Sequence, residues 1–167
     1  GEFTGFERGA VGRLVVDATV VDVVNAGGGG VAYSATNIIE NLQNCTAAIP
    51  TAVYTKEDLY IYMSPKSYRV YIQAISALTG TPWGNMNDKY YPIFEGIKIA
   101  VCTGMNNDVL VAAERGNLFF VTDLISDAVN INLLDMSQLD GSSNLRAVCR
   151  YSGGTQVGIG ADVVLVS

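Results

Sequence analysis

The stretch from Pro92 to Asp127, PIFEGIKIAVCTGMNNDVLVAAERGNLFFVTDLISD, constrains the fold most, because it predicts three short strands separated by tight reversals. Its apolar residues either alternate with other residues or form runs too short for a helix, which is typical of strands. Glycine, asparagine and aspartate tolerate positive φ, so the polar clusters between these runs can reverse the chain. We expect strands at 97–101, 109–113 and 118–121, reversals at 104–108 and 114–117, and an acidic corner from Asp123.

A first helix is expected from Ser34 or Thr36 to Ala48. Its apolar residues recur at helical spacing and form one face, which consists of Ile38, Ile39, Leu42 and Cys45. The hydroxyl of Ser34 or Thr36 can accept from the first backbone N–H groups, and Pro50 ends the helix.

A strand at Leu59–Met63 leads into a second expected helix. Ser64 has the residue type of an N-cap, Pro65 suits the first helical position, and Gly80 suits the C-terminal end. The expected buried stripe consists of Tyr68, Tyr71, Ile72, Ile75 and Leu78.

The remaining chain adds only strands and turns. The valine-rich run Leu14–Val24 favours a strand, and the glycines at 27–30 favour a loop. Further strands are expected at 129–133, 145–151 and 155–166, with a turn at 152–154 and breaks at Gly158 and Gly160. Two helices followed by mostly antiparallel strands indicate an α+β fold rather than repeated βαβ units.

Composition limits the classes of function. The chain has 167 residues, a net charge of −6, and only 10 lysines and arginines, which never cluster. This balance argues against direct nucleic-acid binding, which needs a basic surface. The apolar run 14–24 contains Asp17 and Asp22 and is too short to span a bilayer, so no membrane association is expected. The three cysteines are far apart and suit small buried hydrophobic roles.

No catalytic or metal site is expected. Histidine is absent, which removes Ser-His-Asp and Cys-His catalysis and histidine-based zinc sites. Asp123 and Asp127 lie four residues apart and could act as paired carboxylates, but aspartates at a turn more often bond their own backbone.

The glycine loop suggests one alternative function, the binding of a nucleotide. Gly27, Gly29 and Ala32 match the G-x-G-x-x-A pattern between a predicted strand and a predicted helix, which is the pattern of dinucleotide-binding loops. Four consecutive glycines match many such patterns, however, and the next strand ends at Met63 without the expected acidic residue. A small α/β nucleotide-binding or enzyme domain, or a soluble protein-binding module, therefore remains the alternative, and no cofactor is predicted.

Three segments resemble the C-terminal portion of tailed-bacteriophage major capsid proteins of the Hong Kong 97-like fold. These are LYIYMSPKSYR from Leu59, the GIKI, VAAERGNLFF and TDLISD pieces between Gly96 and Asp127, and RAVCRYSGGTQVGIGADVVL from Arg146. The resemblance runs from about Thr36 to the end of the chain. Members of that family are usually longer and carry an N-terminal arm, an extended loop and a spine helix ahead of this region.

The resemblance implies a structural role. It implies an axial-domain-like region at 14–128 with a central, mostly antiparallel sheet flanked by two helices, and closing peripheral-domain strands at 129–167. A loose leader is expected at 1–13, because residues 4–13 are rich in glycine and charge. It makes the reversal at 114–117 a structural hairpin, and it places the loop 81–92 near a capsomer axis. The expected subunit-contact residues in that loop are Trp83, Asn85, Tyr90 and Tyr91.

The partners and location follow from the same resemblance. The chain is expected to contact copies of itself in capsomers and other virion proteins, in a virion capsid assembled in the bacterial host cytoplasm. An encapsulin-type compartment shares the fold and stays open as a second shell.

Overall fold

The structure is a computed structural model, and it describes residues 17–79, 93–122, 130–137, 143–150 and 153–167, together with Val11, Leu14 and Gly141. The chain forms two compact units. The first contains residues 1–119 and 157–167, and the second contains residues 120–156. The last residues of the chain therefore belong to the first unit.

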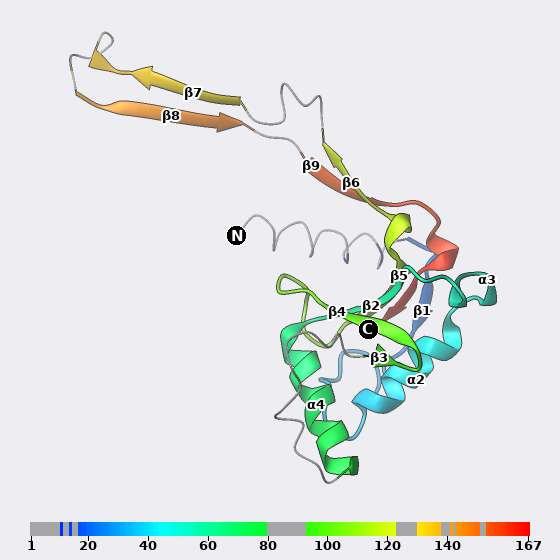
Figure 1. The fold of residues 1–167 in the computed structure, drawn as a ribbon. Helices are drawn as coiled ribbons and strands as arrows, with labels where there is room; N and C mark the ends of the chain where they lie inside the picture. Colours follow the sequence, from blue (N-terminus) through cyan, green and yellow to red (C-terminus); the bar gives the residue numbers. More distant parts are fainter. Residues whose placement is uncertain are drawn as a thin grey trace. The chain divides into compact units, whose positions relative to one another are not determined.

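A six-stranded sheet organises the first unit (Figure 1). The strand order is β1-β10-β5-β2-β4-β3, in which β1 with β10 and β2 with β4 are parallel and the other three pairs are antiparallel. The strands are β1 Val21–Val23, β2 Leu59–Met63, β3 Ile93–Phe94, β4 Ile97–Val101, β5 Leu110–Glu114 and β10 Val164–Val166. This mixed but mostly antiparallel sheet, with its few helices, confirms the predicted α+β class.

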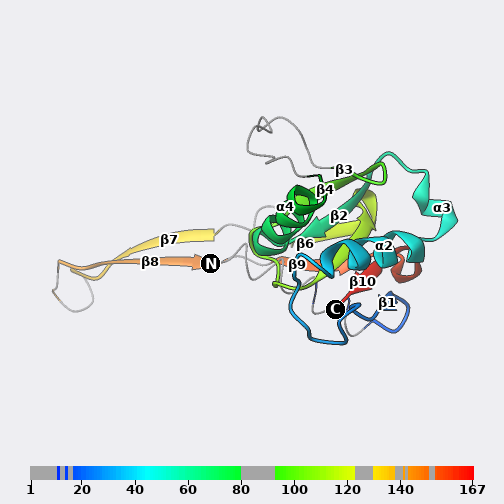
Figure 2. The same ribbon diagram turned by 90° about the horizontal axis from the view of Figure 1, so that it is seen from below.

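Two helices cover one face of the sheet. They are α2, Ile38–Ala48, and α4, Pro65–Thr79, which lie side by side in Figure 2, and the short α3, Thr51–Tyr54, follows α2. Leu42 and Cys45 of α2 share one core with Tyr71 of α4 and Ile61 of β2. The predicted apolar face of α2 is confirmed, since Ile38, Leu42 and Cys45 are buried and Ile39 is partly buried. The stripe predicted for α4 is confirmed at Tyr71, which is buried, whereas Tyr68, Ile72 and Ile75 are only partly buried.

A second, smaller core lies on the other face of the sheet. Successive residues of β5 point to opposite faces of the sheet. Leu110 and Ala112 therefore join the core beneath α2 and α4, which we call the helical core, while Val111 and Ala113 join the second core. Val11 and Leu14 contribute to this second core and are almost completely buried.

Two local predictions in the N-terminal half were wrong. Leu14 is helical, and among the described residues of this run the strand is β1 alone. The chain turns before it, where Thr19 donates from its backbone N–H and its hydroxyl to Asp17 Oδ1. The helix α2 begins at Ile38 with Asn37 at the N-cap, not with Ser34 or Thr36, and Asn37 makes no side-chain cap hydrogen bond.

The predicted hairpin at 114–117 is a corner instead. Residues Arg115–Asn117 form a 3-10 turn, after which β6, Leu118–Thr122, pairs with β9, Gly153–Val157, and not with β5. The Asn117 side chain holds the corner: its Nδ2 donates to the Ile159 carbonyl at 2.8 Å, and its Oδ1 accepts from the Ile159 N–H at 2.7 Å. A buried side-chain amide thus takes the place of a backbone hairpin.

The second unit contains a two-stranded ribbon. It consists of β7, Asn130–Asp135, and β8, Leu145–Arg150, which pair antiparallel with Leu133 opposite Ala147 (Figure 1). We call it the β7–β8 ribbon. Both strands were expected from their alternation, whereas Gly153 and Gly154, expected in a turn, lie in β9. The grouping of residues 129–167 as one set of strands also differs from the structure, because the buried β10 joins the six-stranded sheet.

The predicted start of α4 is confirmed in detail and gives a test. The Ser67 N–H donates to Ser64 Oγ at 3.2 Å, and Ser64 Oγ donates to Asn107 Oδ1 at 3.1 Å, with Pro65 as the first helical residue. Ser64→Ala should lower the free energy of unfolding by about 1–2 kcal/mol, since the cap is lost in a buried position. Urea unfolding with an unchanged m-value measures this loss.

The matched control is Ser76→Ala in the middle of the same helix. Ser76 Oγ donates to the Ile72 carbonyl one turn earlier, a contact that adds little, and alanine favours helix, so a change within about 0.5 kcal/mol is expected. Equal losses for the two variants would contradict the capping role of Ser64.

The buried thiol of Cys45 predicts that the protein becomes less stable at alkaline pH. Burial raises the pKa of its thiol to about 12, from an ordinary value of 9.0. Above about pH 9 the thiol ionises in the unfolded state but stays neutral in the folded state. The free energy of unfolding is therefore unaffected by this group below about pH 9, and above it falls by up to about 1.4 kcal/mol per pH unit. Urea unfolding of wild type and Cys45→Ala across this range measures the difference, and identical slopes would refute the assignment.

Candidate functional site

Several expected site residues fall outside the described part of the chain. Trp83, Asn85, Tyr90 and Tyr91 lie there, as do Asp123 and Asp127. Among the described residues, no group of three or more histidine, cysteine, aspartate or glutamate side chains could hold a metal ion.

The glycine loop after β1 is closed by two buried asparagines. The Ala26 N–H donates to Asn41 Oδ1 at 2.7 Å, and the Gly27 N–H donates to Asn25 Oδ1 at 3.1 Å. Asn41 Nδ2 donates in turn to Asn25 Oδ1 at 2.8 Å, and Asn25 Nδ2 donates to the Val31 carbonyl at 2.7 Å. The loop therefore uses its own amides to fix its shape.

This geometry does not fit a phosphate-binding loop. Such a loop presents free N–H groups at the first turn of a helix, so that the helix N-terminus faces the phosphates. Here the N–H groups of Ala26 and Gly27 are engaged by asparagine side chains, and α2 begins only at Ile38, six residues beyond Ala32. The pattern that suggested a dinucleotide site is thus explained by a structural loop.

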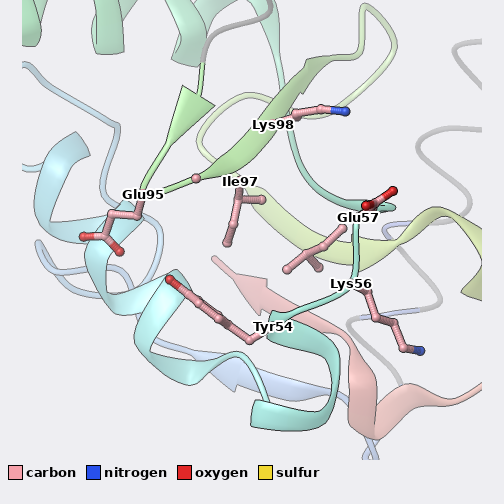
Figure 3. A pocket seen from close by; sticks show the side chains of 8 residues that line it. Tyr54, Lys56, Glu57, Glu95, Ile97 and Lys98 are labelled. Atoms are coloured by element: carbon pink, nitrogen blue, oxygen red, sulfur yellow. The ribbon is translucent and has the colours of Figure 1, made fainter.

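A pocket of about 370 Å³ lies beside the β3–β4 turn (Figure 3). Its floor is formed by Leu59 and Ile97, both buried, and its rim includes Tyr54, Glu95 and Lys98. Glu95 and Gly96 both have positive φ, 48° and 86°, which is the backbone of a tight two-residue hairpin turn.

The ionisable groups of this pocket do not form a reaction centre. Glu95 Oε2 accepts from Thr46 Oγ1 at 2.8 Å, and Lys56 pairs with Glu114 outside the pocket. In Figure 3 the charged ends of Lys56 and Lys98 point away from the floor rather than toward each other. General acid–base catalysis needs groups that converge on one reacting atom, and the side chains here do not.

Three strands of the structure expose apolar side chains, which is the feature of this chain that best suits binding to another surface. Phe119, Phe120 and Val121 of β6 are exposed, and so are four aliphatic residues of the β7–β8 ribbon, namely Ile131, Leu133, Leu134 and Leu145. Their segments were predicted as strands, and strand periodicity does not show whether a side chain is buried or exposed. In the described part of the chain no helix is long and apolar enough to cross a bilayer.

The overall architecture is a phage major-capsid-like fold. A structure of Mycobacterium phage Che8 superposes with a TM-score of 0.59 and 13% identity, over 89% of this chain and 53% of that chain. The virus-like particle from Pyrococcus furiosus gives a TM-score of 0.59 and 11% identity, over 95% and 59%. The capsid of an empty GTA particle gives a TM-score of 0.61 and 13% identity, over 88% and 49%. The chain therefore spans about half of each of these chains.

The sequence comparisons point to no established family. No family model matches the chain. A protein of Erwinia tasmaniensis named NAD kinase is 30% identical over 139 residues, which cover 70% of this chain and 46% of that protein. The chain thus spans less than half of that relative.

The asparagine network gives a test of the loop assignment. Asn41→Leu should lower the free energy of unfolding by about 2–4 kcal/mol, because Ala26 N–H and Asn25 Oδ1 each lose a buried partner. Gln43→Leu, at an exposed position of the same helix, should change it by less than about 0.5 kcal/mol. Thermal or urea unfolding compares the two, and a tolerated Asn41→Leu would show that the network does not hold the loop.

Proposed function

We propose that this chain is a structural subunit of a bacteriophage icosahedral capsid, which associates with copies of itself into capsomers and a shell. The single observation that carries the proposal is the capsid-like fold, which extends over nearly all of the chain. The exposed apolar strands support it, because contiguous exposed apolar surface is typical of association sites. The role requires no cofactor and no chemical step.

The mechanism of such a subunit is geometric. The sheet with α2 and α4 on one face and the second core on the other gives a body with well-packed cores, which keeps its interface residues in fixed positions. Repeated head-to-tail contacts between identical bodies close into rings around symmetry axes. Buried apolar surface supplies the affinity, and charges at the rim set the register.

The partners and location belong to the same proposal. The main partners are other copies of this chain, and other virion proteins are further partners. The location is the virion capsid, after assembly in the host cytoplasm. Trp83, Asn85, Tyr90 and Tyr91 remain proposed contact residues within capsomers. An encapsulin-type shell remains the alternative shell within this proposal, and the similarity to the virus-like particle from Pyrococcus furiosus shows that the fold is not confined to phage capsids.

Particle formation tests the proposal. Purified protein should form rings or closed shells in negative-stain electron microscopy, and its mass by analytical ultracentrifugation should rise with concentration. A monomer at every concentration, with no particles, would contradict the shell function. Nuclease treatment serves as a control, since assembly driven by nucleic acid would be lost and assembly driven by protein contacts would not.

A nucleotide-binding function has one observation in its favour, the similarity to a protein named NAD kinase. If this chain bound a dinucleotide or ATP, a ligand at 100 times its dissociation constant would stabilise the fold by about 2.7 kcal/mol. Under the capsid proposal, neither NAD nor ATP should shift the unfolding transition. A saturable shift that Gly29→Val abolishes would favour the alternative.

A further inference from the structure

A pocket of about 170 Å³ borders the second core. Val11 and Leu14 line it and are almost completely buried, although they precede the first strand of the sheet in the chain. The sheet contributes Tyr62 of β2 and Val111 of β5, and Leu118 lines the pocket from the start of β6. The pocket therefore lies where Val11 and Leu14 meet the sheet.

The lining of this pocket is almost entirely apolar. Cys102 and Met105, which follow β4, complete it, and none of the described lining residues is charged. The hydroxyl among them belongs to Tyr62, and burial raises the pKa of this phenol to about 12, so the group is neutral at physiological pH. A water molecule needs two to four polar partners to be held in a cavity, and apolar cavities stay dry. Water is therefore a poor occupant of this pocket.

The volume of the pocket selects the size of its ligand. Protein interiors contain few voids larger than a water molecule, so an empty space of about 170 Å³ leaves many apolar contacts unmade. An apolar cavity of about 150 Å³ engineered into another protein binds benzene and xenon. Pockets for drug-sized molecules are larger, at about 300 Å³ and above. A compact molecule with about six carbon atoms thus matches the space.

We propose that this pocket is a binding site for a small apolar molecule of the size of benzene. The ligand contacts Val11 and Leu14 as well as Val111 of the sheet, so it adds apolar contacts between the N-terminal residues and the sheet. Tyr62 and Leu118 are only partly buried, so the pocket reaches the surface and a ligand can enter it without unfolding the chain. The site does not rest on the shell function, since every described lining residue belongs to the first unit of one chain.

Binding of benzene to the full chain tests the proposal. Isothermal titration calorimetry should show one site per chain with a dissociation constant of about 0.1–1 mM, the range that burial of six apolar carbon groups supports. Benzene should also raise the urea midpoint in a saturable way. Pyridine has the same size, but its ring nitrogen loses a hydrogen bond to water, so it should bind at least about tenfold more weakly. Equal affinity for the two rings would show that the site is not selective for apolar molecules.

Two variants locate the site. Val111→Phe places a ring in the pocket and should weaken benzene binding at least about tenfold. Val24→Phe, the same change at a position that is 65% exposed, should leave the dissociation constant unchanged within about twofold. Circular dichroism and the urea midpoint show whether each variant is folded. If Val111→Phe does not fold, Met105→Ala enlarges the pocket instead and should bind para-xylene at least about tenfold more tightly than wild type does.

Three results would overturn the proposal. The first is the absence of saturable benzene binding to the wild-type chain. The second is equal benzene affinity of wild type and a folded Val111→Phe variant, which would mean that benzene binds elsewhere. The third, decisive where Val111→Phe does not fold, is an unchanged affinity of Met105→Ala for para-xylene. Because none of these measurements depends on rings or shells, a failure here leaves the proposed capsid function standing.

Discussion

The first unit depends on the insertion of the last strand, β10, between β1 and β5. Val164, Leu165 and Val166 are almost completely buried, and β10 pairs in parallel with β1 and antiparallel with β5. Its side chains alternate between the two cores, since Val164 and Val166 join the helical core and Leu165 joins the other. Without β10, β1 would lose the one strand partner that it has among the described residues, and both cores would be open.

Polar ties fix the segments that surround this sheet. Tyr33 donates from its backbone N–H to Asp108 Oδ1 and from its hydroxyl to the Val166 carbonyl, which connects the loop before α2 to the turn before β5 and to β10. Asn41 holds the glycine loop, and Asn117 holds the corner that leaves the sheet. These ties satisfy backbone groups that are buried or partly buried, and a fully buried backbone group left unpaired costs about 1–3 kcal/mol. A body held in this way suits a role that depends on shape.

The regular elements were largely predictable, and the special side chains were not. The strand Leu59–Met63 and the start of α4 at Ser64 and Pro65 follow from local signals, period-two patterning and capping chemistry. Asn41 and Asn117 carried no such signal, because their backbone partners Ala26 and Ile159 are distant in the sequence. The glycine pattern at 27–32 was misleading for the same reason, since whether its N–H groups are free depends on Asn41, fifteen residues from Ala26.

The exposed β7–β8 ribbon shows the same division. Alternation in 129–133 and 145–151 predicted strands, but alternation does not distinguish a residue that is buried in a core from one that is exposed, as Ile131, Leu133 and Leu145 are. Local interactions along the chain, such as periodicity, caps and turns, determined the helices, the strands and the α+β class. Strand order, the place of β10 and the exposure of the ribbon were decided only in the tertiary structure, because they depend on pairings between residues far apart in sequence, which no local pattern encodes.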